Sequence, residues 1–257
     1  MMSRNLILVI GLFRRTGTTH LRDLLCCHRD CVPSPIPEDF LLARSSLLIQ
    51  YANETSASWG ASSRTAKPHL MDALRWSLMR FLSGGHESFR IVSKTPTVEG
   101  IELIDEVFPN AKVVLIIRDG RDTLESGRRS FNWNLLEGAK LWRKNVERLL
   151  SFQQERPGRA LIVRFEDLVS DMRGTMTRVL EHCNLDNSRY GWEQAARAPV
   201  RGSSDQVRDT SERGMDWHPR IRSADFSPIG RWKSWSARDR QDFEAGAGDA
   251  LWRLGYR

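Results

Sequence analysis

The chain has 257 residues, of which 40% are hydrophobic and 28% are charged, and its formal net charge is +7. That length and apolar content suit one domain with a sizeable core over residues 1–257, and the positive excess favours an anionic ligand such as a nucleotide, a nucleic acid or a membrane surface. The four cysteines include no CxxC pair and no His cluster accompanies them, so the sequence predicts reduced thiols and no metal site. The first apolar run, 6–13, is too short to span a bilayer and lacks a signal-peptide cleavage site, which predicts a cytoplasmic protein without a membrane span.

Predicted strands and helices alternate along the chain. The segments 5–11 and 111–117 are continuous apolar runs, which are typical of strands buried on both faces of a parallel sheet. Shorter strands are expected at 89–93 and 160–165, and residues 53–68, rich in Ser, Ala and Thr, are expected to form a loop. This alternation predicts an α/β fold with a central, mainly parallel sheet flanked by helices.

The turn after the first strand carries the first group of candidate functional residues. A turn between a buried strand and a helix directs free backbone N–H groups at one point. Gly17 lets the backbone approach an anion, Thr16, Thr18 and Thr19 add hydroxyl donors, and Arg15 adds a full charge. A Walker A loop that started at the final glycine of the strand would have Gly at position 16 and Lys at position 17, so an ordinary ATP or GTP loop is disfavoured.

A second group of candidate residues follows the strand at 111–117. Arg118 stands at the carboxyl end of that strand, and Ser126 lies eight residues later in the next predicted helix. Ligands of open α/β sheets bind at the carboxyl ends of the strands. An Arg at this edge and a Ser on the following helix can hold a second phosphate.

Both groups, in this order, resemble the sulfotransferase family that depends on PAPS (3′-phosphoadenosine 5′-phosphosulfate), and its bacterial and Golgi-type branch in particular. The matching segments are Arg15-Thr16-Gly17-Thr18-Thr19, Lys94-Thr95-Pro96, Arg118-Asp119-Gly120-Arg121-Asp122 with Ser126, Phe165-Glu166-Asp167-Leu168 and Gly230-Arg231-Trp232-Lys233. The resemblance implies a P-loop-like three-layer fold and transfer of a sulfuryl group from PAPS to an acceptor hydroxyl or amine, with PAP (3′-phosphoadenosine 5′-phosphate) as product and no metal.

The same resemblance implies which residues hold the donor. The first loop would hold the 5′-phosphosulfate, and Arg118 with Ser126 would hold the 3′-phosphate. Phe165 stands where the family has Tyr and would stack on adenine. An Arg-Lys-Gly triplet of some members is absent, so its contact with the 3′-phosphate would fall to Arg222 or Arg231. The expected donor-binding residues are Arg14, Arg15, Thr16, Gly17, Thr18, Thr19, His20, Arg118, Ser126, Phe165, Arg222, Arg231, Trp232 and Lys233.

Three catalytic residues are implied by the resemblance. Arg15 and the loop N–H groups would stabilise the leaving phosphate, and Lys94 would reach the bridging oxygen. Glu38, expected at the start of a helix, is the first choice for the general base that takes the acceptor proton, with Asp39 and His69 as alternatives.

Two other functions compete with sulfuryl transfer. A nucleotide-dependent kinase with an atypical phosphate loop would need Mg²⁺ ligands and an ATP lysine. A basic nucleic-acid-binding protein would cluster Lys and Arg with aromatic residues, whereas the arginines here are spread along the chain. The sequence therefore predicts no nucleic acid as partner. For the acceptor, a small molecule is the first expectation, and a small-molecule alcohol or phenol, an amine, a saccharide and a peptide tyrosine all remain open. The loop residues that are expected to line an aromatic acceptor pocket are Trp59, Trp133 and Trp217.

Overall fold

A five-stranded sheet forms the centre of the computed structural model, which describes residues 5–60, 65–199, 206–208, 217–219 and 227–257. Its order is β2-β3-β1-β4-β5, and every pairing is parallel. The predicted α/β fold around a central parallel sheet is therefore confirmed. The strands are β1 (Leu6–Gly11), β2 (Cys31–Pro33), β3 (Arg90–Thr95), β4 (Lys112–Ile117) and β5 (Leu161–Arg164).

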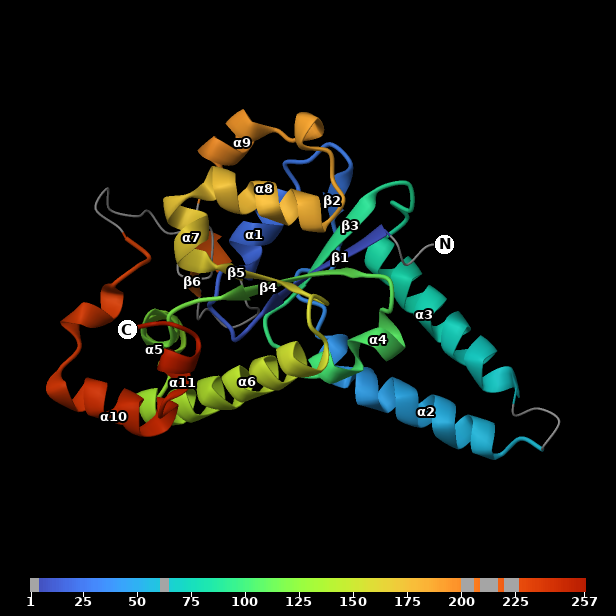
Figure 1. The fold of residues 1–257 in the computed structure, drawn as a ribbon, viewed down its shortest axis with the longest axis horizontal. Coiled ribbons are helices and arrows are strands. Elements are labelled where there is room, and N and C mark those ends of the chain that lie inside the picture. The colour runs from blue at the N-terminus through green and yellow to red at the C-terminus, as the bar shows by residue number, and fades with distance from the viewer. Residues whose placement is uncertain (1–4, 61–64, 200–205, 209–216, 220–226) are drawn as a thin grey trace.

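Helices cover both faces of this sheet, which gives the three layers (Figure 1). One face is covered by α1 (Thr18–Leu25), α7 (Phe165–Ser170), α8 (Met172–His182) and α9 (Trp192–Arg197). The other is covered by α4 (Ile104–Val107), α6 (Leu135–Glu155), α10 (Ala237–Ala247) and α11 (Ala250–Arg253). The remaining described elements are α2 (Ser45–Ala57), α3 (Lys67–Ser83), α5 (Gly120–Phe131), the 3₁₀ turns η2 (Leu42–Arg44), η4 (Ile101–Leu103), η5 (Asn187–Arg189) and η7 (Arg231–Ser234), and the antiparallel pair β6 (Gln206–Arg208) and β7 (Trp217–Pro219).

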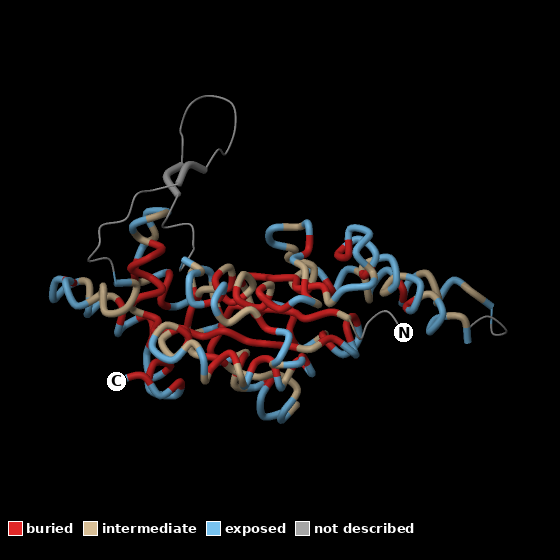
Figure 2. The backbone as a smooth tube through the Cα atoms, turned by 90° about the horizontal axis from the view of Figure 1, so that it is seen from above, coloured by how far each residue is buried: buried red, intermediate tan, exposed pale blue. Residues whose placement is uncertain are grey.

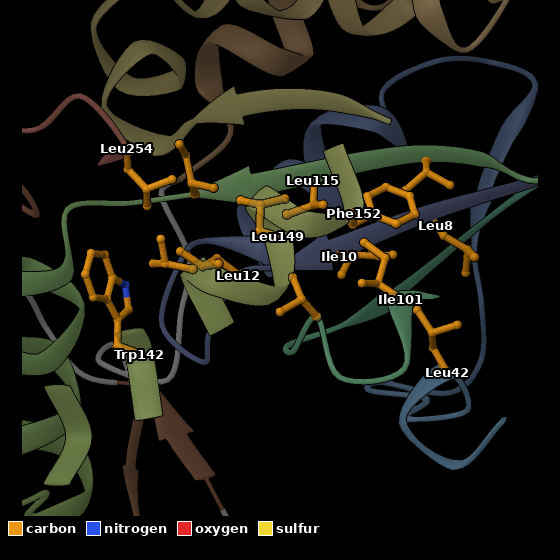
Figure 3. Packing of buried hydrophobic residues seen from close by; sticks show 14 of the residues in the cluster. Leu8, Ile10, Leu12, Leu42, Ile101, Leu115, Trp142, Leu149, Phe152 and Leu254 are labelled. Atoms are coloured by element: carbon orange, nitrogen blue, oxygen red, sulfur yellow. The ribbon is translucent and has the colours of Figure 1, made fainter. Parts of the chain in front are cut away.

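Strand β1 is buried on both faces because its side chains alternate between two hydrophobic cores. Leu8 and Ile10 pack into the core under α6, which Figure 3 shows from close by, whereas Ile7 and Val9 pack into the core under α1 and α8. All six residues of β1 are buried. Figure 2 shows a similar pattern for the central strands: β1, β3 and β4 are almost wholly buried, the edge strands β2 and β5 are less so, and the outer helices carry many of the exposed residues. The predicted two-sided burial of the first strand is correct.

Helices α2 and α3 extend away from the sheet (Figure 1). The predicted loop at 53–68 is partly wrong, because α2 continues to Ala57 and α3 begins at Lys67. Polar residues at the exposed end of α2 show no apolar periodicity, so the sequence pattern does not mark them as helical. Within the described residues, no helix is both long enough and apolar enough to cross a membrane. The four cysteines, all of them described, are free thiols.

Candidate active site

The loop between β1 and α1 is held in a conformation that opens the start of the helix. Arg15 and Gly17 both have positive φ, 76° and 102°. Thr16 is buried and donates its hydroxyl hydrogen bond to the Phe13 carbonyl at 2.8 Å. Among the described residues, no side chain caps the N-terminus of α1 and its first turn has no acidic residue. The first N–H groups of α1 therefore remain available for an anion.

Phe165 brings the end of β5 against this loop. A Cβ at Gly17 would lie 2.4 Å from the Phe165 ring, so only glycine fits there. The other side of the contact is Arg118, whose guanidinium lies 4.6 Å from the centre of the same ring. The phenylalanine thus joins the loop after β1 to the residue after β4. Its predicted stacking on adenine stays a prediction.

The structure joins the two groups of residues that the sequence singled out. Nε and Nη2 of Arg15 donate to Oγ of Ser126 at 3.1 and 3.0 Å. Nη1 of Arg118 donates to the Arg15 carbonyl at 2.8 Å. Residues more than 100 positions apart in the sequence therefore form one bonded group at the carboxyl edge of the sheet.

Arg118 is the most deeply buried cation of this group. Its side chain also donates to the Pro228 carbonyl, and within the described part of the chain its Nε has no hydrogen-bond partner. Burial lowers the pKa of Arg118, and the nearby Arg231 lowers it further, while Asp122 opposes both effects. A buried guanidinium with a spare N–H donor and a second cation nearby fit a phosphate.

Asp122 holds the C-terminal segment against this edge, and sequence reasoning did not give it that role. Its carboxylate accepts from the backbone N–H groups of Gly230 and Arg231, both at 2.7 Å, and of Trp232 at 3.4 Å. The Trp232 ring lies 3.8 Å from the guanidinium of Arg121. Burial raises the pKa of Asp122, and the hydrogen bond from Gly230 opposes that shift. Asp122 of α5 thus holds the segment 230–233 next to the loop between β1 and α1. No local sequence signal indicates that Asp122 and this segment are in contact.

Lys94 and Glu38 form an ion pair next to the loop. Nζ of Lys94 donates to Oε1 of Glu38 at 2.9 Å. The lysine is 4% exposed, whereas the Glu38 side chain is 42% exposed. Burial lowers the pKa of Lys94, and Glu38 opposes that shift. The expected position of Glu38 at a helix start is wrong: it lies in the irregular segment before η2, where the proline-rich stretch 33–37 delays the helix.

The two alternative bases have different surroundings. Asp39 accepts hydrogen bonds from the Ser93 hydroxyl and, at 3.0 Å, from the backbone N–H of Leu41. Burial raises the pKa of Asp39, and the bond from Ser93 opposes that shift. His69 is exposed in the first turn of α3, at the end of that helix that projects away from the sheet (Figure 1). Glu38 is the carboxylate that combines a contact with Lys94 and access to solvent.

The other predicted donor-binding residues lie in varied surroundings. Arg14 is exposed and lies over the Phe40 ring at 5.7 Å. His20, expected to bind the donor, is buried on α1. Thr18 is buried at the start of α1, Thr19 is half-buried, and Lys233 is exposed. Arg222 lies outside the described residues.

Two further residues support the site from behind. Asn145 of α6 donates to the Leu12 carbonyl at 2.9 Å, which ties the start of the loop to that helix. Glu166 accepts from the backbone N–H of Asp119 and from the Tyr256 hydroxyl, both at 2.9 Å. Glu166 thus joins the start of α5 to Tyr256 near the C-terminus. Asn145 carried no signal, because its partner is a backbone atom far away in the sequence.

A cavity of about 490 Å³ lies beside the loop. Its wall includes Phe13 and Arg14 before the loop glycine, Phe40 and Arg44 beyond Glu38, and Trp133 after α5. Of the three tryptophans expected at a pocket, Trp133 lines this one. Trp59 lies after the end of α2, and the side chain of Trp217 lies outside the described part of the chain. Across the described residues, no three His, Cys, Asp or Glu side chains gather as a metal site would require.

The fold and this edge define a class of protein: an α/β enzyme with an anion-binding loop after its first strand. The sequence matches the description "Sulfotransferase family" over residues 7–189. The chain belongs to this family, and its predicted identity as a sulfotransferase is confirmed. A search of curated proteins found no significant match.

Solved structures show the same fold at low sequence identity. The sulfotransferase domain from the curacin biosynthetic pathway is 16% identical, with 98% of each chain covered and a TM-score of 0.58. Mouse sulfotransferase SULT7A1, solved with PAP, is 10% identical over 96% of this chain and 84% of that chain, with a TM-score of 0.56. The sulfotransferase domain of the Synechococcus PCC 7002 olefin synthase is 21% identical over 70% of this chain and 74% of that chain, with a TM-score of 0.51. At these identities the comparison supports the fold.

Proposed function

We propose that this sulfotransferase moves the sulfuryl group of PAPS to a hydroxyl or amine of a small-molecule acceptor. PAPS carries anionic groups at both ends of an adenosine, so it needs two sites of positive potential on one edge. The start of α1 with Arg15 is one such site, and Arg118 with Arg231 is the other. When bound, PAPS supplies the sulfuryl group and a phosphate leaving group.

The single observation that carries this proposal is the bonded group of Arg15, Ser126 and Arg118. The loop arginine donates to the serine of α5, and Arg118 donates to the carbonyl of that same arginine. The two predicted phosphate sites are thereby neighbours on one edge. A preorganised set of donors needs little rearrangement to stabilise charge that builds on a leaving oxygen.

Glu38 and Lys94 supply the remaining chemistry in this proposal. Glu38 accepts the proton of the acceptor group through its solvent-accessible carboxylate, and Lys94 donates to the oxygen that leaves sulfur. Their ion pair at 2.9 Å keeps the two groups on the same side of the loop. Asp39 holds the segment in place through Ser93 and Leu41, which makes it a positioning residue.

Isothermal titration with PAP and with AMP tests the proposal. Two anion sites predict that PAP binds at least ten times more tightly than AMP, because one charged hydrogen bond contributes about 1.5–3 kcal/mol. Incubation with labelled PAPS and a panel of hydroxyl and amine acceptors should then transfer the label without ATP. Equal affinity for PAP and AMP, or no affinity for either, would contradict the donor assignment.

A further inference from the structure

The cavity of about 490 Å³ continues from the three segments that form the reacting centre. Arg14, which lines it, directly precedes Arg15. Phe40 lines it two residues after Glu38, and Thr97 lines it three residues after Lys94. An extended chain advances at most about 7 Å over two residues and about 11 Å over three. The cavity therefore opens within reach of both members of the Lys94–Glu38 pair.

One wall of this cavity is an aromatic surface fixed by packing. The Trp133 ring meets Phe13 edge-on at 5.5 Å and stacks on Phe131 at 5.8 Å. Phe131 in turn lies under the guanidinium of Arg15 at 5.6 Å. A Cβ at Gly127 would lie 1.8 Å from the Trp133 ring, so the tryptophan rests directly on the backbone of α5. A flat apolar group can lie against such a surface beside the loop arginine.

The charged residues of the lining are unevenly paired. In the described part of the chain, no hydrogen bond or ion pair is made by the guanidinium of Arg44, and Arg14 makes only its contact with the Phe40 ring. Glu137 also lines the cavity but is paired with Lys140 at 2.7 Å. Glu99 is the lining carboxylate left to oppose the two arginines. Because Lys140 neutralises Glu137, the two arginines exceed the one remaining carboxylate, Glu99, by one positive charge.

We propose that this cavity binds the acceptor as a ring-bearing molecule with an anionic substituent, with the ring on Trp133 and the anion at Arg44. The inference rests on the proposed function and names the acceptor class for it. An arginine fork pairs well with a carboxylate. A substituent on the ring opposite the reacting hydroxyl would extend outward, away from the anionic donor and toward Arg44.

Three matched phenols test this inference: p-hydroxyphenylacetate, p-ethylphenol and tyramine, which are anionic, neutral and cationic beside the same ring. We expect the PAP-loaded protein to bind the anionic phenol about fivefold more tightly than the neutral one, as for an exposed ion pair, and tyramine most weakly. With labelled PAPS, kcat/KM should follow the same order. Titration calorimetry and label transfer measure the two quantities independently.

Arg44→Ala should remove the preference for the anionic phenol and leave the values for p-ethylphenol unchanged. Arg178→Ala, an exposed arginine on α8, is the matched control and should keep the preference. Gly127→Ala should lower the affinity for all three phenols by a similar factor, since the new methyl group displaces the Trp133 ring into the cavity. Circular dichroism confirms that each variant is folded.

The outcomes separate this inference from the proposed function. If PAP binds but the three phenols bind equally, or tyramine binds best, or none of them binds, the acceptor class is wrong while the donor assignment stands. A preference for the anion that survives Arg44→Ala would also overturn it. A protein that binds no PAP would contradict the proposed function itself.

Discussion

The carboxyl edge of the sheet around Arg15, Arg118 and Asp122, here called the donor edge, and the proposed acceptor cavity are built in different ways. At the donor edge, Thr16, Arg118 and Asp122 are all buried and bonded to backbone atoms: Thr16 bonds within its own loop, and the other two bond to distant segments. At the cavity, Arg44 and Leu141 are exposed, and the described structure gives the Arg44 side chain no bonded partner. The donor edge is therefore part of the fold, whereas an exposed lining residue such as Arg44 can change without loss of the fold. Substitutions on the two sides should consequently differ in kind as well as in size.

The largest effect is expected where the two regions meet, at Glu38. Glu38→Gln should lower kcat by about 10²–10⁴-fold, because a positioned base contributes that much. The affinity for PAP should not change, since among the residues that the structure describes this side chain bonds only to Lys94. Single-turnover transfer and PAP titration measure the two quantities. A fully active variant would exclude Glu38 as the base, and Asp39→Asn is then the next substitution to make.

Arg15→Ala should lower kcat by about 10²–10³-fold, the usual loss when one donor to the developing charge is removed. The affinity for PAP should also fall, because the substitution removes the hydrogen bonds to Ser126 that join the two phosphate sites. Arg178→Ala on α8 is the control for a lost surface charge. An unchanged kcat in Arg15→Ala would mean that the loop has a structural role and does not stabilise the leaving phosphate.

Asp122→Ala tests whether the donor edge belongs to the fold. It leaves the backbone N–H groups of Gly230 and Arg231 without their carboxylate. We expect the free energy of unfolding to fall by about 1–3 kcal/mol, whereas Arg44→Ala should change it by no more than about 0.5 kcal/mol. Urea denaturation of both variants measures this difference. Equal losses would remove the distinction between the two regions.

The smallest expected effect is a shift of the alkaline limb of the pH profile. Burial lowers the pKa of Lys94, so its proton is lost at a lower pH than in a free lysine. If protonated Lys94 donates to the leaving oxygen, kcat/KM falls as the pH rises through that lowered pKa. Lys94→Arg keeps the charge and should move the fall to higher pH. If the alkaline limb lies at the same pH in the wild type and in Lys94→Arg, a group other than Lys94 causes it.

The sequence predicted the donor edge because its signals are local. Buried strands appear as unbroken apolar runs, and β1 and β4 lie where those runs are. Arg15 and Arg118 each stand just after such a strand, so their convergence follows from the parallel sheet. The family resemblance added the order of the segments and thus the family, which the match over residues 7–189 confirms. The catalytic roles and the single domain over 1–257 stay predictions.

The remaining features depend on contacts that no short segment contains. Asp122 acts on Gly230, and Asn145 acts on the Leu12 carbonyl, in each case more than 100 positions away. A hydrogen bond to a backbone atom cannot be predicted from the pattern of side chains, because every residue has the same backbone groups. The cavity combines Phe13, Phe40 and Trp133 from three separate connections. Only the tryptophan was expected there, because an aromatic residue in a predicted loop is a local signal.

The left-handed backbone of Arg15 has a consequence for engineering. A non-glycine residue with φ of 76° costs about 1–3 kcal/mol, and glycine would adopt it freely. A selection that rewarded heat resistance alone would favour glycine at this position and discard the guanidinium. Mutant libraries designed to raise the thermal stability of this protein should therefore keep Arg15 unchanged and tolerate the strain of its backbone.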